Sequence, residues 1–308
     1  MKQPVKAAAR QGETDMQIQL ADEAMIRRLL PPRSQNTHKG HYGRALLVCG
    51  AVGYTGAAYF AAQSAVCSGA GLVDLTVPSP IYEIAAVKLN EAMVFPLPAT
   101  PEGTVSEQAI PAIRKRMSAA TAVLAGCGLG RSTDVEQVVL TLVTEANQPV
   151  VLDADGINAM CSHKDAMRAA KADLVLTPHD GELTRLLGEP PVHPGESRPE
   201  AAVRLAAALN VTLVMKGHQT VTAAPDGRVC LNSTGNAGMA RGGSGDVLAG
   251  MITALLAQGL NPFEASAAAV YLHGLAGDLA RKKLGETGMT PTDMLQLIPQ
   301  AFYQCRGV

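Results

Sequence analysis

Short apolar runs alternate with helix-like segments along most of this chain. The apolar runs predict buried strands over residues 44–50, 72–77, 122–125, 150–153, 174–177 and 212–216. Helical apolar spacing or alanine-rich composition predicts helices over residues 56–68, 81–88, 134–146 and 201–209. Buried strands that alternate with helices are typical of a parallel sheet covered on both faces. The pattern therefore predicts an α/β fold with three layers, α/β/α, around a mostly parallel central sheet.

The two ends of the chain depart from this alternation. Residues 21–30 predict a helix that stops before Pro31. Strand-like residues 221–224 and 228–231 flank a Pro-Asp-Gly sequence, which predicts a hairpin. Three more helices are predicted over residues 246–258, 262–282 and 291–303. With no internal repeat or linker evident, we expect a flexible tail over residues 1–16 and a single domain over residues 17–308.

Composition excludes several classes of protein. The chain has 308 residues, 47% of them hydrophobic, which is enough for a large core. Its net charge of -1 shows no basic excess for nucleic acid or anionic membranes, and aromatic residues make up only 3%. The N-terminus lacks the apolar centre of a signal peptide, and no uncharged apolar stretch approaches the ~18 residues of a membrane span. We expect a cytoplasmic protein.

The six cysteines do not suggest a metal or disulfide framework. They stand at positions 49, 67, 127, 161, 230 and 305, with no Cys-x-x-Cys pair. Their spacing is unlike that of zinc sites or small disulfide-rich scaffolds. The prediction is that they act as small apolar residues in a reducing compartment.

Polar and glycine-rich clusters follow the predicted strands. They lie at residues 50–53, 126–130, 153–156, 177–182 and 216–217. In α/β sheets, ligands bind beyond the carboxyl ends of the strands, so these clusters are expected to converge on one edge. The glycine patterns lack a full dinucleotide fingerprint, and no P-loop sequence is present, so a nucleotide site here must be of another type.

The strongest cluster is residues 232–246, which leads directly into an apolar helix. Glycines let several N–H groups converge, and a helix start adds unpaired donors and partial positive charge, which together predict a phosphate site. Asp246, in the first helical turn, is interpreted as an acid/base group facing this anion site. The alternative is that Asp246 only complements the helix dipole while Ser244 caps the helix. Either way, a carboxylate at a helix start is expected to stay ionised.

Three other clusters carry candidate functional groups. His179 either donates a hydrogen bond to a ligand or is a helix-start residue bonded to the backbone, and Glu182 can anchor Mg²⁺ through water if a helical turn begins there. Lys216 is either solvated or part of a tight turn against a flat ligand. Asp153 and Asp155 form a poor acid/base pair. Asp155 caps the next helix or contacts phosphate or magnesium.

These segments together resemble the ribokinase-like superfamily and, more closely, the ADP/ATP-dependent NAD(P)H-hydrate dehydratases. The resemblance covers about residues 20–305 and rests on residues 38–50 (HKGHYGRALLVCG), 56–58 (GAA), 126–130 (GCGLG), 152–158 (LDADGIN), 176–182 (LTPHDGE), 215–220 (MKGHQT) and 232–246 (NSTGNAGMARGGSGD). Together the segments are specific, although each alone is not.

The resemblance implies a nicotinamide nucleotide repair enzyme. ADP, or ATP in some members, phosphorylates the ring hydroxyl of the S-epimer of NADHX or NADPHX, and loss of phosphate yields NADH or NADPH, with AMP as the other product of ADP. The implied substrate contacts are Ala58, Gly128, His179 and Asp246. The implied nucleotide contacts are Lys216, Gly217, His218, Gln219, Thr220 and Gly245. The resemblance implies that Asp246 is the base and that Mg²⁺ is the metal, with Glu182 as its water-mediated anchor. It also implies a homotetramer.

Two departures from the family are visible. The family usually reads His-Pro-Gly-Glu where this chain has His179-Asp180-Gly181-Glu182, so we expect Asp180 to shape the turn by its own side-chain hydrogen bond. Some relatives also carry an N-terminal epimerase domain of ~200 residues. About 20 residues precede the match here, so epimerase activity is not expected.

Two rival functions are considered. The first is a kinase of the same superfamily that acts on a vitamin-like alcohol and leaves a stable phosphorylated product. The second is a nucleotide-sensing module without activity. The sequence disfavours a sensor, because a sensor does not need a carboxylate in its anion site.

Overall fold

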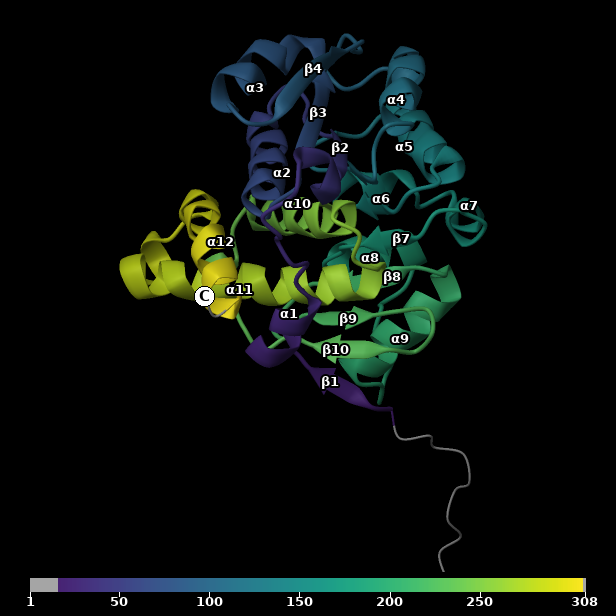
Figure 1. Cartoon of the computed structure of the whole chain (residues 1–308). Helices are drawn as coiled ribbons and strands as arrows, with labels where there is room; N and C mark the ends of the chain where they lie inside the picture. Colours follow the sequence, from purple (N-terminus) through teal and green to yellow (C-terminus); the bar gives the residue numbers. More distant parts are fainter. Residues whose placement is uncertain (1–15, 307–308) are drawn as a thin grey trace, which may run out of the picture.

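A computed structural model describes residues 16–306, and its central feature is a ten-stranded sheet (Figure 1). Across the sheet, the strands follow the order β1-β10-β9-β8-β7-β6-β5-β2-β3-β4. Their bounds are β1 (Ile18–Leu20), β2 (Arg44–Val48), β3 (Leu72–Pro78), β4 (Met93–Leu97), β5 (Ala122–Ala125), β6 (Val150–Leu152), β7 (Leu174–Leu176), β8 (Thr212–Met215), β9 (Val221–Ala223) and β10 (Val229–Leu231).

The sheet is parallel through its whole centre. Strands β2 to β8 pair in parallel, whereas β9 pairs antiparallel with both β8 and β10. This confirms the predicted parallel sheet and the hairpin. Strands β1 and β4 were not predicted, because β1 is three exposed residues long and β4 contains Pro96.

The strand order reverses between β2 and β5. The chain runs outward from β2 to β3 and β4, then returns to the other side of β2 with β5 and continues to β8. In open α/β sheets such a reversal opens a crevice beyond the carboxyl ends of the two strands, and ligands bind there. The carboxyl ends of β2 and β5 lead into the glycine clusters that begin at Gly50 and Gly126.

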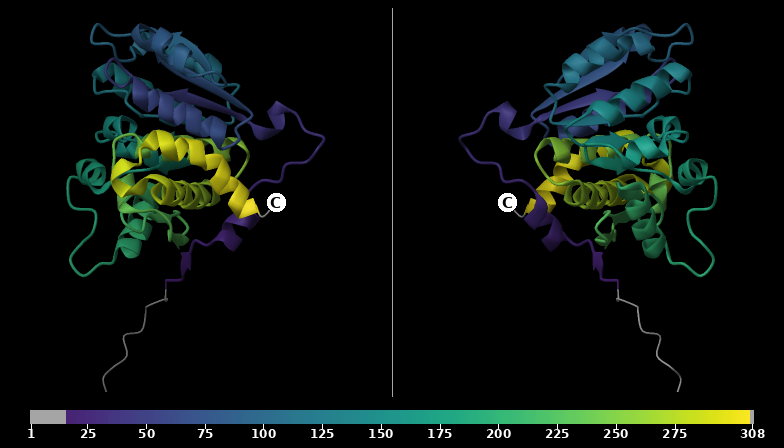
Figure 2. Two further views of the ribbon diagram at one scale, coloured as in Figure 1. Left: turned by 90° about the vertical axis from the view of Figure 1, so that its left-hand side faces the viewer. Right: turned by 90° about the vertical axis from the view of Figure 1, so that its right-hand side faces the viewer.

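Helices cover both faces of the sheet (Figure 2). The cores place α1, α2, α3, α10, α11 and α12 on one face and α4 to α9 on the other. Their bounds are α1 (Glu23–Leu29), α2 (Thr55–Cys67), α3 (Tyr82–Lys88), α4 (Ile110–Met117), α5 (Thr133–Glu145), α6 (Asp155–Ala159), α7 (Lys164–Arg168), α8 (Asp180–Leu187), α9 (Arg198–Leu209), α10 (Ser244–Ala257), α11 (Pro262–Gly288) and α12 (Pro291–Arg306), with short 3-10 turns η1 (Lys39–Tyr42), η2 (Ser79–Ile81), η3 (Glu107–Ala109) and η4 (Ala237–Met239).

Alternation along each central strand divides the core in two. On β5, Leu124 packs into the core beneath α10, whereas Val123 packs into the core beneath α5 and α9. Successive side chains of a strand point to opposite faces, so a strand buried on both faces must be apolar throughout. This explains the uninterrupted apolar runs and confirms the α/β/α layers.

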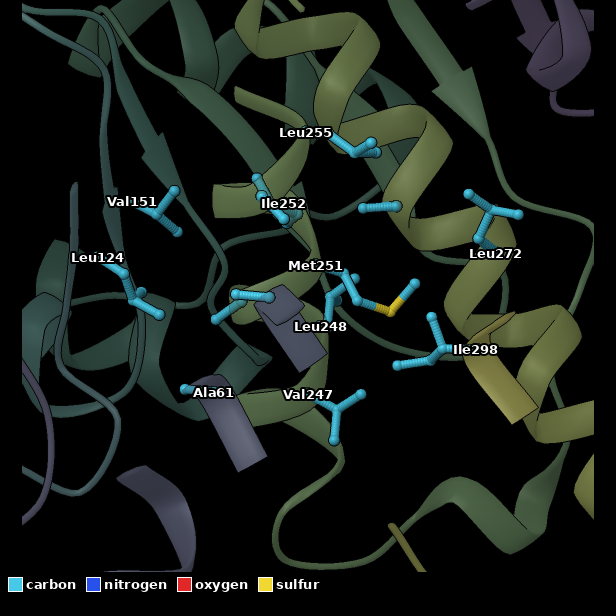
Figure 3. Close-up of a cluster of buried hydrophobic side chains, with 14 of the residues drawn as sticks. Ala61, Leu124, Val151, Val247, Leu248, Met251, Ile252, Leu255, Leu272 and Ile298 are labelled. Atoms are coloured by element: carbon cyan, nitrogen blue, oxygen red, sulfur yellow. The ribbon is translucent and has the colours of Figure 1, made fainter. Parts of the chain in front are cut away.

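Helix α10 is the buried centre of one layer (Figure 3). It lies between the sheet residues Leu124 and Val151, helix α2 and the helices α11 and α12. Gly250 makes this packing possible, because a Cβ at that position would lie 2.1 Å from the Ala61 carbonyl oxygen of α2. A helix enclosed on all sides by other elements is expected to be apolar all round, as α10 is.

Helix α11 is longer than the predicted helix over residues 262–282. It extends to Gly288, and a non-helical Gly285 separates its last turn. Four of the six cysteines are buried and two are partly buried, which agrees with the predicted role as small apolar residues. Within residues 16–306, no helix is both long enough and apolar enough to cross a membrane. The predicted tail lies outside the described residues, apart from Met16.

The close contact of α10 with α2 can be tested by Gly250→Ala. The added methyl group overlaps the Ala61 carbonyl oxygen and the Ser64 hydroxyl, so the free energy of unfolding is expected to fall by about 1–3 kcal/mol, despite the better helix propensity of alanine. Urea denaturation measures this change. Gly288→Ala is the matched control, since a Cβ there meets no atom within 4 Å. Equal stability of the two variants would contradict this packing.

Candidate functional site

The polar clusters converge on the carboxyl edge of the sheet, as predicted. The Gly50 amide donates to the Cys127 carbonyl oxygen at 2.9 Å, which joins the loops after β2 and β5. The Lys216 amide donates to the Pro178 carbonyl oxygen at 2.9 Å, which joins the segments after β8 and β7. Parallel pairing brings these loops together because all the strands end at the same edge.

A buried ion pair lies at the centre of this edge. Asp153, 2% exposed, follows β6, and its Oδ1 accepts from Lys216 Nζ at 2.9 Å and from Thr177 Oγ1 at 2.7 Å. Its Oδ2 faces the Cys127 thiol at 3.6 Å. Sequence reasoning assigned no central role to Asp153, because the link to Lys216 depends on which strands are neighbours. The sequence feature that points to a role for Asp153 is its position at the end of a predicted strand.

Lys216 is held between carboxylates. Burial alone would lower the pKa of its ammonium group, but the charges of Asp153 and Glu182 outweigh burial and raise it. A Cβ at Gly245 would lie 3.2 Å from Lys216 Nζ, so the ammonium group sits directly against the first turn of α10. A fixed positive charge therefore lies beside a helix N-terminus, which suits phosphate.

Asp246, in the first turn of α10, belongs to the same cluster. Single ligand atoms of Asp246, Asp153 and Cys127 lie within 4.8 Å of one another. Burial and the neighbouring charge of Asp153 raise the pKa of Asp246 to about 7, although the Cys127 thiol and Lys216 oppose the shift. The expectation that this carboxylate stays fully ionised was therefore wrong, because desolvation exceeds the effect of the helix start. A pKa near neutrality is well suited to a general base.

The glycine turn before α10 is shaped by backbone freedom. Gly243 is the N-cap with φ of +100°, and a Cβ there would lie 2.8 Å from the Phe60 ring. The alternative in which Ser244 caps the helix was wrong, because Ser244 is the first helical residue. Its hydroxyl is buried and, within residues 16–306, has no hydrogen-bond partner. His273 of α11 lies next to the backbone of Ser244. Burial lowers the pKa of His273 to about 4, so its imidazole ring is neutral at physiological pH.

His179 and Glu182 cap helix α8 reciprocally. His179 Nδ1 accepts from the Gly181 and Glu182 amides at 3.0 and 3.3 Å, and Glu182 Oε2 accepts from the His179 amide at 2.9 Å. A turn does begin here, and the helix-start interpretation of His179 is confirmed. The outer part of the ring remains open, since the side chain is 55% exposed. Glu182 is buried and lies 3.9 Å from Lys216 Nζ.

Asp180 does not shape this turn as expected. Its carboxylate accepts from both terminal nitrogens of Arg198 on α9, at 2.8 and 3.0 Å. The turn is formed by the capping box instead, which frees Asp180 for the arginine. Arg198 also donates to the Lys216 carbonyl oxygen at 2.6 Å and thereby links α8 to the segment after β8.

Asp155 does not cap α6 either. The residue before the helix is Ala154, with φ of +48°, and Asp155 is the first helical residue. Its Oδ2 accepts from the Gly130 amide at 2.9 Å. Asp155 therefore fixes the end of the loop after β5.

The other predicted site residues lie at this edge but differ in exposure. Ala58 is fully buried in α2, and Gly128 packs with φ of +64° against the first turn of the same helix. Gly217, His218 and Gln219 are exposed in the loop between β8 and β9. Thr220 Oγ1 donates to the Gly217 carbonyl oxygen at 3.1 Å and closes that loop. The carboxyl edge of the sheet thus has an exposed loop between β8 and β9 and a tightly packed glycine turn after β5.

This fold and site define a class of α/β proteins in which a glycine-rich turn, a lysine and an acidic residue meet at the start of one helix. A structure of a ribokinase-like superfamily protein from Enterococcus faecalis is similar, with a TM-score of 0.79, 26% identity, and coverage of 98% of this chain and 99% of that chain. A structure of the ADP/ATP-dependent NAD(P)H-hydrate dehydratase from Bacillus subtilis, co-crystallised with ATP/Mg²⁺, has a TM-score of 0.77, 31% identity, and coverage of 94% and 99%. The ribokinase-like fold is confirmed.

Sequence comparison identifies the family. Residues 45–300 match the model of the NAD(P)H-hydrate dehydratase family, and the chain belongs to that family. It is 42% identical to the bifunctional NAD(P)H-hydrate repair enzyme Nnr of Moorella thermoacetica over 91% of this chain and 53% of the relative. It is 33% identical to the ADP-dependent (S)-NAD(P)H-hydrate dehydratase of Bacillus subtilis over 93% and 99%. The chain thus spans about half the length of the first curated relatives it matches.

Removal of the positive charge at residue 216 tests the buried ion pair. Lys216→Met leaves Asp153 without its counter-ion, so the free energy of unfolding is expected to fall by roughly 3 kcal/mol. Chemical denaturation at neutral pH measures the loss. Lys283→Met, at an exposed lysine, serves as the control and should leave stability unchanged. A similar small effect in both variants would show that Lys216 does not neutralise Asp153.

The raised pKa of Asp246 predicts a pH-dependent stability difference. The unfolded chain releases this proton near pH 3.8 and the native state near pH 7, so the wild-type carboxyl group loses stability as pH rises between these values. Asp246→Asn cannot lose a proton, so it should gain roughly 2 kcal/mol relative to wild type from pH 4 to pH 8, a value discounted for partial solvent access. Denaturation at both pH values checks this, with Asp165→Asn, 96% exposed, as control. A pH-independent difference would rule out the raised pKa.

Proposed function

We propose that this chain catalyses the ADP- or ATP-dependent dehydration of the S-epimer of NADHX and NADPHX to NADH and NADPH. The family supports this activity. The observation that carries it is the Asp246 carboxyl group, with a pKa of about 7, in a helix N-terminal turn beside the fixed charge of Lys216. A base and a positively charged anion site stand side by side, as the transfer of a phosphoryl group to a hydroxyl requires.

Asp246 acts on the ring hydroxyl of the hydrated nicotinamide. Its carboxylate accepts the hydroxyl proton while the oxygen bonds to the β-phosphorus of ADP, and the bond from that phosphorus to the bridging oxygen breaks to release AMP. The electron pair of the ring nitrogen then expels phosphate, a much better leaving group than hydroxide, and loss of a proton from the neighbouring carbon restores the dihydronicotinamide. Positioning and charge stabilisation are the main contributions of the protein.

The remaining site residues divide into two groups. Ala58 and Gly128, beside the reversal of strand order, and His179, after β7, contact the hydrated cofactor, and the open part of the His179 ring is available for this. Residues 216–220 and Gly245 contact the adenine nucleotide, with the exposed Gly217, His218 and Gln219 able to reach it without rearrangement of the core.

Mg²⁺ fits this site through water. Both oxygens of Glu182 have protein neighbours, because Oε2 accepts from the His179 amide and Oε1 lies 3.3 Å from His179 Nε2. A direct bond from Glu182 to the metal would break the cap of α8, whereas Mg²⁺ ordinarily retains several waters. When bound, the ion supplies neutralisation of nucleotide phosphate charge. Lys216, 3.9 Å from Glu182, holds a second positive charge at the same place.

The proposal includes the organisation of the protein. Residues 17–308 act as one domain, supported by two cores on opposite faces of a shared sheet. The resemblance supports a homotetramer, which light scattering of the purified protein tests, and the sequence pattern supports a cytoplasmic location. A monomer at enzymatically active concentration would remove the tetramer from the proposal and leave the activity untouched.

Turnover of NADHX is the direct test. With ADP or ATP and Mg²⁺, the wild type should produce NADH absorbance from NADHX. Asp246→Asn should retain nucleotide affinity and lose turnover by at least about 100-fold, the contribution expected of a positioned base. Asp165→Asn is the control and should match wild type.

The outcomes separate the rival functions. No NADH from NADHX together with a stable phosphorylated alcohol would identify a small-molecule kinase. Normal turnover by Asp246→Asn would exclude this residue as the base. Nucleotide binding without any turnover of either substrate class would support a sensor.

A further inference from the structure

Cys127 has no part in the steps above, yet it lies between the two carboxylates of the site. It is fully buried in the turn after β5, and its sulfur is 3.6 Å from Asp153 Oδ2. Among the hydrogen bonds of residues 16–306, this thiol is the protein donor to that oxygen, because Lys216 and Thr177 both donate to Oδ1. One carboxylate oxygen of Asp246 also lies within 4.8 Å of this sulfur.

The thiol keeps its proton. Contact with the thiol of Cys49, which follows β2, and complete burial raise the pKa of Cys127 well above its usual range. A neutral buried thiol is a poor nucleophile and a poor metal ligand, since both roles require the thiolate. It remains a hydrogen-bond donor with one proton.

Asp246 needs such a donor. Asp153 and Asp155 place negative charge beside it from the end of β6 and from α6. The cation that faces it is Lys216 from the end of β8, and this ammonium group is already bonded to Asp153. His273 of α11, behind Ser244, is neutral at physiological pH. Without a donor between them, the two carboxylates would repel each other in a poorly solvated place.

We propose that Cys127 is a positioning residue for Asp246, with a thiol proton that is shared between the carboxylates of Asp153 and Asp246 and holds Asp246 in the orientation and charge state of a base. The role as base rests on the proposed function, whereas the shared proton does not. No bond to sulfur is made or broken.

The shared proton can be measured without turnover. Protein labelled with ¹³C at the aspartate carboxyl carbon is titrated by NMR, and the Asp246 resonance is identified by its loss in Asp246→Asn. Cys127→Ala should raise the Asp246 pKa by about half to one pH unit, the value of one ordinary hydrogen bond, because a thiol is a weak donor. Cys127→Ser retains a donor and should keep the Asp246 pKa at or below that of the wild type.

A matched control and a contrary result complete this test. Cys67→Ala, at a partly buried cysteine that contacts Gln63 on α2, should leave the Asp246 titration unchanged. An unchanged Asp246 pKa in Cys127→Ala, or equal shifts in the alanine and serine variants, would overturn the proposal. If Cys127→Ala does not fold, Cys127→Ser decides the question. An Asp246 pKa in Cys127→Ser well above that of the wild type would contradict a shared proton.

The pH profile of NADHX dehydration gives a second readout. The acid limb of kcat/KM should move to higher pH in Cys127→Ala, so that the loss of activity is larger at pH 6 than at pH 8. A structural role alone would lower activity equally at both pH values, and that result would overturn the positioning role. If the wild type produces no NADH, the proposed function fails, and the NMR titration still decides whether the proton is shared.

Discussion

The arrangement of the site depends on one constraint, the burial of helix α10 along nearly its whole length. Because α10 is enclosed by the sheet, α2, α11 and α12, its axis and its N-terminus have little freedom. The close approach at Gly250 fixes its distance from α2. The first turn of α10 therefore stands at a defined place beyond the carboxyl ends of β5 and β6, where Asp246 meets Cys127 and Asp153 from the two segments that follow these strands.

The same constraint sets the electrostatics of that edge. Four carboxylates, from Asp153, Asp155, Glu182 and Asp246, act there against the ammonium group of Lys216. Lys216 is committed to Asp153, so Asp246 carries the cost of desolvation and its pKa rises towards neutrality. A helix start would favour the ionised form if Asp246 were solvated. In this site, burial and a like charge exceed that effect, and the result is a group that can both accept and release a proton near neutral pH.

Much of the architecture was predictable from local pattern. Strand β5 was placed at its observed bounds, and the other predicted strands lie within two residues of theirs, since apolar runs of four to seven residues have few other solutions in a buried sheet. Strands β1 and β4 escaped prediction because β1 is only three residues long and exposed, and the apolar run of β4 contains Pro96. The glycine-rich turn and Asp246 were also found, because an acidic residue among glycines before an apolar helix is a strong local signal.

The sequence alone determined the layers, the edge at which the loops meet and the glycine-rich turn that places Asp246 at a helix start, because periodicity and glycine placement act within one segment. Tertiary structure decided how those residues are connected. Asp153 pairs with Lys216 only because β6, β7 and β8 are neighbours, and Asp180 binds Arg198 because the capping box already holds its turn. The protonation of Asp246 and of the Cys127 thiol depends on burial and on charged or thiol groups from other segments of the chain, which no local pattern contains.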